Sequence, residues 1–193
     1  MKKRERPKKG VLWDGIMDAS TGKKCLFIDR DGTMGASADV EFPDTFTPFP
    51  YIKECVEIAH RAGWTVCGFT NQSCFARGKD RGHDFEAEFR GYGFDALFLC
   101  PHDNGQGCDC RKPKPGLLFR AREEIGADLS SSIVIGDRET DLAAGSAAGC
   151  RTVLVRTGRK KTPEDEKNFE KHNLLFVADD LLGAVRRIAE EVK

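Results

Sequence analysis

Short apolar runs alternate with longer amphipathic segments along most of the chain. Residues 24–30 (KCLFIDR) form an apolar run that ends in charged residues, a pattern typical of a buried parallel strand. Residues 51–63 carry apolar side chains at helical spacing and end at a glycine, which predicts a helix. Strands that alternate with helices in this way predict a parallel sheet with crossover connections.

The alternation continues almost to the end of the chain. We expect strands over residues 24–30, 64–70, 94–100, 131–137, 151–158 and 174–179. We expect helices over residues 51–63, 115–126, 139–149 and 180–192, and the segment 79–93 has room for only a short one. The predicted fold is therefore α/β: a Rossmann-like, doubly wound parallel sheet with helices on both faces.

The composition is that of an ordinary globular domain. The 193 residues are 39% apolar and 32% charged, and Lys+Arg and Asp+Glu both number 31. The zero formal net charge gives no whole-protein attraction to nucleic acid, and no apolar run approaches the roughly 18–20 residues that span a bilayer. We expect a cytoplasmic monomer that acts on a small molecule, with neither a membrane nor a nucleic acid as partner.

The first residues differ in character from the rest. Residues 1–10 contain six Lys or Arg and a single Glu. They lead into a short mixed run rather than the apolar core of a secretory signal. We expect residues 1–23 to form a basic, solvated arm and residues 24–193 to form the folded domain. The alternative for the arm is a contact with a polyanion.

Polar residues directly after the predicted strands are the candidates for chemistry, because ligands bind at the carboxyl ends of the strands in an open α/β sheet. Aspartates follow two of these strands, at Asp29, Asp31 and Asp137. Three carboxylates at one sheet edge repel one another unless a cation lies between them, and hard oxygen ligands favour Mg²⁺. The aspartates therefore predict a magnesium site.

Basic and hydroxyl side chains follow the other strands. Arg111, Lys112 and Lys114 lie in one segment, and Thr70 ends the strand before it. These groups suit phosphate oxygens. An acidic, metal-binding half that faces a basic, phosphate-binding half is typical of phosphoryl transfer.

A metal-ligand pattern, Cys-x-His-x5-Cys-x-Cys, precedes this basic segment. Cys100, His102, Cys108 and Cys110 supply three thiolates and one imidazole. Four protein ligands complete a tetrahedral zinc site and leave no open position, so the pattern predicts a structural Zn²⁺ rather than a catalytic one. The zinc would order the loop that presents the two basic residues directly after it.

Four motifs resemble those of the haloacid dehalogenase (HAD) superfamily of phosphatases, and they occur in the same order. The motifs are FIDRDGT (27–33), FTNQS (69–73), the lysine of CRKPKPG (110–116) and VIGDRETD (134–141). The ordered set is more specific than any one motif. The short intervals between the first three leave no space for a separate cap domain, so we expect a capless enzyme.

The resemblance implies a role for each matching residue. Asp29 would be the nucleophile that forms an aspartyl-phosphate. Asp31 would be the general acid that protonates the leaving oxygen and then the base that activates water. Thr70 and Lys112 would hold the phosphoryl group, and Mg²⁺ would bind Asp29, the backbone carbonyl of Asp31, and Asp137.

The zinc loop narrows the resemblance to the zinc-loop phosphatases that act on heptose bisphosphates or on histidinol phosphate. TNQS and the later segment LVRTGRKKTPED (154–165) are more similar to the heptose enzymes. This implies removal of the 7-phosphate of a heptose 1,7-bisphosphate, with Asn71, Gln72, Ser73 and Arg111 in contact with the substrate. The loop over residues 34–40, where the family has further substrate contacts, matches poorly.

Three alternatives remain open. A histidinol-phosphate phosphatase shares the zinc loop. A polynucleotide 3′-phosphatase shares the first two motifs, and the basic arm could bind its substrate, although the zinc loop and zero net charge count against it. A zinc-stabilised binding protein without turnover is the alternative from another class, and the complete set of reactive residues counts against that one.

Overall fold

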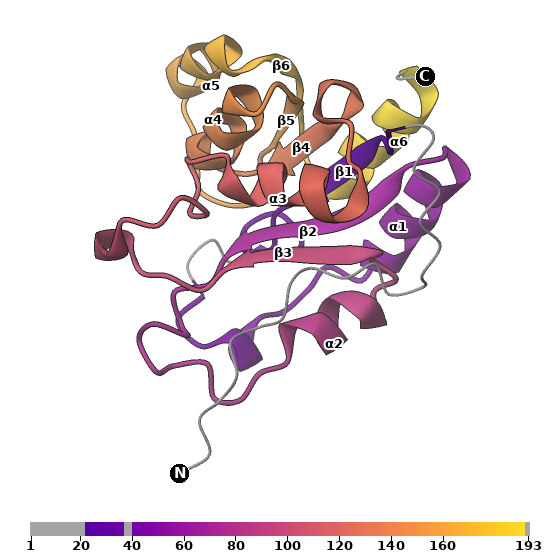
Figure 1. The fold of residues 1–193 in the computed structure, drawn as a ribbon. Helices are drawn as coiled ribbons and strands as arrows, with labels where there is room; N and C mark the ends of the chain where they lie inside the picture. The colour runs from indigo at the N-terminus through magenta and orange to yellow at the C-terminus, as the bar shows by residue number, and fades with distance from the viewer. Residues whose placement is uncertain (1–21, 37–39, 192–193) are drawn as a thin grey trace.

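The computed structural model describes residues 22–36 and 40–191, and six parallel strands form one sheet within them (Figure 1). Residues 1–21 of the expected basic arm and residues 37–39 of the poorly matching loop lie outside the described residues. The strands are β1 (Cys25–Ile28), β2 (Thr65–Asn71), β3 (Ala96–Cys100), β4 (Ile133–Gly136), β5 (Arg151–Val155) and β6 (Leu174–Ala178). Their order across the sheet is β3-β2-β1-β4-β5-β6, which is the predicted doubly wound arrangement.

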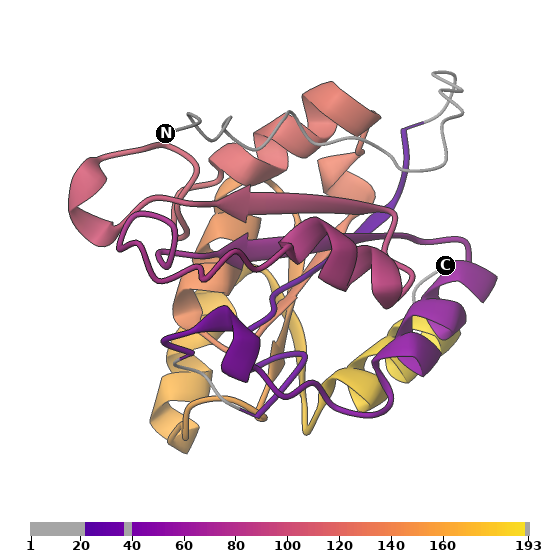
Figure 2. The same ribbon diagram turned by 90° about the horizontal axis from the view of Figure 1, so that it is seen from below.

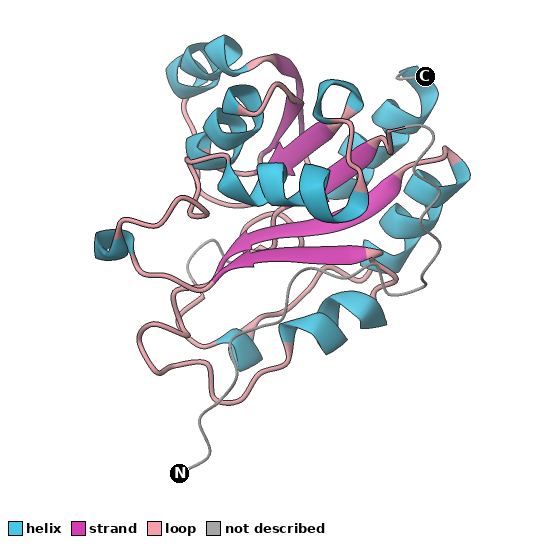
Figure 3. Cartoon of the chain, viewed as in Figure 1, coloured by secondary structure: helices cyan, strands magenta, loops and turns pink. Residues whose placement is uncertain are grey.

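Helices connect successive strands and cover both faces of the sheet (Figure 3). The α-helices of the described residues are α1 (Ile52–Arg61), α2 (Phe85–Gly91), α3 (Gly116–Ile125), α4 (Glu139–Ala147), α5 (Pro163–Phe169) and α6 (Leu181–Glu191). Short 3-10 turns lie at Pro43–Thr45, Asn104–Gln106, Leu129–Ser131 and Glu170–His172. None of these helices is long and apolar enough to span a bilayer.

The alternation of side chains along β1 divides the core into two layers. Leu26 and Ile28 pack into the layer under α1, α2 and α6, whereas Cys25 and Phe27 pack into the layer under α3 and α4. Helices α1 and α6 lie side by side on the first face (Figure 2). All four β1 side chains are fully buried. This explains why the strand is apolar throughout, as expected for a strand covered on both faces.

The two central strands define the place where a ligand can bind. β1 and β4 are hydrogen-bonded neighbours, but the chain leaves them toward opposite halves of the sheet, which opens a crevice at their carboxyl ends. Asp29 follows β1 and Asp137 follows β4. The connections from β1 to β2 and from β2 to β3 carry α1 and α2 and no separate domain within the described residues. Among the residues that the structure describes, no cap domain therefore covers the crevice.

Helix α5 is the main element that the sequence pattern did not predict. It has seven residues and few apolar ones, so hydrophobic periodicity gives no signal for it. Its start carries a different signal, because Thr162 and Asp165 form a reciprocal capping box around Pro163. Polar capping rather than an apolar stripe therefore marks this helix in the sequence.

Candidate active site

Polar side chains from four strand ends meet around one cavity. Its lining residues are Asp29, Asp31, Thr70, Asn71, Arg111, Lys112, Arg138, Thr140 and Asp141. They come from the last residues of β2 and from the segments after β1, β3 and β4, within the four segments that the sequence pattern singled out. The predicted convergence at the carboxyl edge of the sheet therefore occurs.

Three buried carboxylates form the acidic half of the site. Asp29, Asp137 and Asp141 each place one oxygen within 4.8 Å of the others. Burial and the nearby Asp29 raise the pKa of Asp137 to about 6. Its Oδ1 atom is buried and accepts no hydrogen bond. An oxygen in this state, beside two further carboxylates, fits a hard divalent cation.

Lys112 connects the basic half of the site to the acidic half. Its Nζ atom lies 2.7 Å from Asp29 Oδ1 and 2.6 Å from Asp141 Oδ1, and it donates to the Phe69 carbonyl at 2.8 Å. Burial alone lowers the pKa of Lys112, but the two carboxylates outweigh it and the net shift is upward. The lysine is therefore charged, and it offsets only one of the three negative charges beside it.

Two glycines allow the chain to approach Asp137 closely. Gly32, in the turn after β1, has φ +83°, and a Cβ atom there would lie 2.6 Å from Asp137 Oδ2. A Cβ atom on Gly158, in the loop after β5, would lie 1.9 Å from the same oxygen. The backbone N–H of Arg159 donates to Asp137 Oδ2 at 3.2 Å. The loop after β5 thus fixes the carboxylate, and only glycine fits at these two positions.

Asp31 is held at both of its carboxyl oxygens. Arg30 Nη1 donates to Oδ1 at 2.8 Å, and Gln72 Nε2 donates to Oδ2 at 3.2 Å. Burial raises the pKa of Asp31 to about 6, and Asp29 adds to the rise while Arg30 opposes it. A carboxyl group with this pKa holds its proton at a higher pH than an exposed aspartate does, as a general acid requires.

Gln72 orients the hydroxyl of Thr70 as well. Its Nε2 atom donates to Thr70 Oγ1 at 2.9 Å, so the hydroxyl hydrogen of Thr70 is directed elsewhere, and Thr70 lines the cavity. Gln72 itself is 4% exposed and does not line the cavity. The sequence-based prediction gave Gln72 a substrate contact; the structure places it behind two cavity residues instead.

The predicted zinc ligands come together in one cluster. Distances between donor atoms are 3.6 Å for Cys100 to His102 Nδ1, 3.7 Å for Cys100 to Cys108, 3.2 Å for His102 Nδ1 to Cys110 and 3.3 Å for Cys110 to Cys100. Zinc bonds of about 2.0–2.3 Å in a tetrahedron separate the donor atoms by roughly 3.4–3.8 Å. The four side chains therefore fit one Zn²⁺ without rearrangement of the chain.

Several contacts join this zinc loop to the cavity. Arg111 donates through Nη1 to the His102 carbonyl at 2.9 Å and through Nε to Asn104 Oδ1 at 2.6 Å. The amide of Asn71 bridges to the backbone of Lys112, accepting from its N–H at 3.2 Å and donating to its carbonyl at 3.3 Å. The position of both cations therefore depends on the order of the loop.

Two residues expected near the substrate lie further away. Lys114 Nζ contacts the Cys108 carbonyl at 2.9 Å and Asp109 at 3.1 Å, so it stabilises the zinc loop and does not line the cavity. Ser73 Oγ donates to the His102 carbonyl at 3.4 Å and also lies outside the cavity lining. Both residues neighbour the site in sequence, but their side chains point toward the loop.

The structure adds three residues to the predicted site: Arg138, Thr140 and Asp141. All line the cavity. Asp141 also accepts a hydrogen bond from the backbone N–H of Arg138 at 3.0 Å, at the start of α4. Burial raises the pKa of Asp141, and the neighbouring Lys112 opposes this shift. The signal in the sequence was the motif VIGDRETD, which contains Asp141. This residue lies in the first turn of α4, directly after the end of β4, and so stays at the carboxyl edge of the sheet.

Comparisons with known proteins agree with this site. A family model described as HAD-hydrolase-like matches residues 109–184. A D-glycero-beta-D-manno-heptose-1,7-bisphosphate 7-phosphatase from Pseudomonas aeruginosa is 37% identical over 178 residues, which cover 83% of this chain and 98% of that protein. The enzyme of the same name from Escherichia coli K12 is 35% identical over 186 residues, covering 87% and 93%.

A solved structure is similar as well. The crystal structure of D,D-heptose 1,7-bisphosphate phosphatase from B. bronchiseptica, complexed with magnesium and phosphate, matches with a TM-score of 0.72 and 31% identity. The match covers 87% of this chain and 99% of that one. A doubly wound sheet whose switch point holds buried carboxylates and basic side chains around one cavity is typical of a class of phosphoryl-transfer enzymes. Within that class, the chain belongs to the HAD family of phosphatases, as its four motifs predicted.

We expect Gly158→Ala to weaken divalent-cation binding, because the new methyl group must displace the Asp137 carboxylate. A change next to a metal ligand costs about 10- to 100-fold in metal affinity. Titration with Mn²⁺, followed by the electron paramagnetic resonance of the free ion, measures the binding directly. Gly91→Ala is the matched control, since a Cβ atom there meets nothing within 4 Å. Equal affinities in the two variants would show that Asp137 is not a ligand.

Proposed function

We propose that this phosphatase removes the 7-phosphate of a heptose 1,7-bisphosphate through an aspartyl-phosphate on Asp29. The observation that carries the proposal is the single cavity in which Asp29 and Asp31 face Thr70 and Lys112. The names of the similar proteins support the choice of substrate. A cytoplasmic location, a monomeric state and the division into an arm (1–23) and a domain (24–193) stay predictions.

In the first half of the reaction, a carboxylate oxygen of Asp29 attacks the phosphorus atom and the bond from phosphorus to the ester oxygen breaks. The leaving oxygen takes the electron pair and receives the proton of Asp31. Lys112 and the hydroxyl hydrogen of Thr70 donate to the phosphoryl oxygens as their charge shifts. The carboxylate nucleophile divides one difficult displacement into two easier ones.

In the second half, water attacks the phosphorus atom of the aspartyl-phosphate. Asp31, now ionised, accepts a proton from this water, and the bond from phosphorus to Asp29 breaks. Inorganic phosphate leaves, and both aspartates return to their starting states. One residue thus serves as acid and then as base, which a pKa of about 6 allows near neutral pH.

Asp29, Asp137 and the backbone carbonyl of Asp31 would hold Mg²⁺, with Asp141 close by. When bound, the ion neutralises negative charge on the phosphate that would otherwise repel the nucleophile. The residues fit such an ion for two reasons. Lys112 pairs with two of the three clustered carboxylates at hydrogen-bond distance, and Asp137 Oδ1 has no hydrogen-bond donor. Zn²⁺ on the cysteine and histidine cluster would act on structure alone, since its four ligands leave no position for substrate.

Phosphate release tests the choice of substrate. We expect the highest kcat/KM with a heptose 1,7-bisphosphate, compared with histidinol phosphate and a 3′-phosphorylated oligonucleotide. Phosphorus-31 NMR of the product should show that the 1-phosphate remains and the 7-phosphate is lost. Faster hydrolysis of histidinol phosphate would instead assign the enzyme to the alternative with the same type of zinc loop.

We expect Asp29→Asn to retain the fold and to lose at least about a hundredfold in turnover, because an amide is a poor nucleophile toward phosphorus. Acid quenching during turnover of a radiolabelled substrate should trap one labelled phosphate per wild-type chain and none in the variant. The midpoint of thermal unfolding is the control, because it shows whether the loss of one contact to Lys112 destabilises the variant. Activity above about a hundredth of wild type, or a label that persists in the variant, would exclude Asp29 as the nucleophile.

We expect Cys108→Ser to lower zinc content and to reduce kcat/KM on the order of a hundredfold, because a cation misplaced by about 1 Å can cost that much. The requirement for Mg²⁺ should stay. Elemental analysis of the purified protein measures the zinc. Cys55→Ala is the control, since Cys55 is buried in the opposite core layer and should leave zinc unchanged. Full activity in a zinc-free preparation would contradict the proposed role.

A further inference from the structure

A fully buried arginine lies between the two aspartates of the first motif. Arg30 is 0% exposed, and its guanidinium donates through Nη1 to Asp31 Oδ1 at 2.8 Å. The remaining contacts lead away from the cavity. Nε and Nη2 donate to the two carboxylate oxygens of Glu88 on α2 at 2.9 and 3.0 Å, and Nη2 also donates to the Pro43 carbonyl at 3.1 Å.

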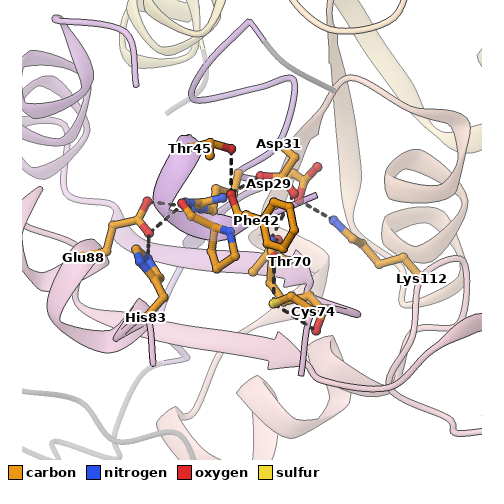
Figure 4. A network of polar contacts seen from close by, with 12 residues as sticks. Asp29, Asp31, Phe42, Thr45, Thr70, Cys74, His83, Glu88 and Lys112 are labelled. Carbon is orange, nitrogen blue, oxygen red and sulfur yellow. Dashed lines mark hydrogen bonds and ion pairs between the residues drawn. The ribbon is translucent and has the colours of Figure 1, made fainter. Parts of the chain in front are cut away.

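The guanidinium is fixed from several directions. Its Cζ atom lies 3.8 Å from the ring centroid of Phe46 and 5.1 Å from that of Phe85. Glu88 binds it in the two-point geometry that sets the plane of a guanidinium. His83 Nε2 contacts Glu88 Oε2, the oxygen that also accepts from Arg30 Nη2. Figure 4 shows Glu88 and His83 at one end of this network and Lys112 at the other, with Asp29 and Asp31 between them.

The consequence for Asp31 is a carboxyl group that cannot rotate. Arg30 occupies a lone pair on Oδ1, and Gln72 occupies one on Oδ2. Rotation about the bond from Cβ to Cγ would break both hydrogen bonds. Each oxygen retains one further lone pair, and Asp31 lines the cavity. The proton that moves to or from a substrate is therefore held in a fixed direction.

We propose that Arg30, anchored by Glu88, is a positioning residue that orients Asp31 for proton transfer. This inference rests on the proposed function, because it assumes that Asp31 is the general acid. It goes further in assigning catalytic importance to α2, a helix whose residues do not line the cavity. A buried arginine with a purely structural role would need only the contacts to Glu88 and Pro43.

Substrates with different leaving groups distinguish a role of Arg30 in positioning Asp31 from a role in protein stability alone. The kcat/KM value reports the steps up to formation of the aspartyl-phosphate, in which Asp31 acts only as an acid. We therefore propose to measure kcat/KM for 4-nitrophenyl phosphate, phenyl phosphate and an alkyl phosphate, in order of increasing need for a proton. The variants are Arg30→Gln, Glu88→Gln and, as reference, Asp31→Asn.

We expect Arg30→Gln to lower kcat/KM about a hundredfold with the alkyl phosphate and less than about fivefold with 4-nitrophenyl phosphate, since general acid catalysis contributes roughly 10²–10⁴. Glu88→Gln should show the same trend more weakly. Asp84→Ala is the control. This substitution removes the N-terminal cap of α2 and destabilises the helix without changing Arg30. Any decrease in kcat/KM should therefore be equal across the three esters.

The outcomes separate the two levels of the proposal. Selective loss with the alkyl ester in Asp31→Asn and Arg30→Gln, but not in Asp84→Ala, supports the inference. Selective loss in Asp31→Asn alone overturns it and leaves the proposed mechanism standing. Equal losses across the esters in Asp31→Asn overturn the acid role, and the inference with it. Where Arg30→Gln fails to fold, Glu88→Gln decides by the same criterion.

Discussion

Excess buried negative charge at the switch point of the sheet is the constraint on which the rest of the site depends. Asp29, Asp137 and Asp141 are at most 6% exposed, and the ammonium of Lys112 offsets only one of their charges. Water cannot screen like charges at this depth, so the arrangement is stable only with protonation or a counter-cation. A divalent cation bound at this cluster would supply positive charge that Lys112 alone does not provide. The close approach of Gly158 limits the movement of the Asp137 carboxylate within this cluster.

The loop that carries the cysteine and histidine cluster positions the basic side chains on the other side of the cavity. Lys112 must lie at the acidic cluster, yet the loop between Cys100 and Cys110 has few apolar residues with which to fold. Ligation of a metal ion by the cysteine and histidine cluster would supply the order that a hydrophobic core supplies elsewhere. Asn71, at the end of β2, then binds the backbone of Lys112 and aligns the loop with the sheet. In a capless enzyme, such short ordered loops are the elements left to shape the substrate site.

The sequence predicted the sheet, the four converging segments and the zinc cluster, because each follows from a local pattern. Strands alternate with helices, and ligand spacing depends on residues close in the chain. The roles of Gln72 and Asp141 were not predictable in the same way. Gln72 belongs to a recognised motif, but only its side-chain direction shows that it donates to Asp31 and Thr70. Asp141 became part of the site through the start of α4, and helix α5 depends on polar capping that hydrophobic periodicity does not detect.

Two buried cations at the site make parallel sets of contacts. Lys112 contacts Asp29, the proposed nucleophile, and a second carboxylate, Asp141, while Arg30 contacts Asp31 and a second carboxylate, Glu88. Buried ion pairs of this kind add little to stability, because desolvation offsets most of their attraction. These ion pairs instead fix the orientation of the side chains that they join. The second carboxylate holds each cation in place, so that the cation can hold Asp29 or Asp31 in one orientation at the cavity.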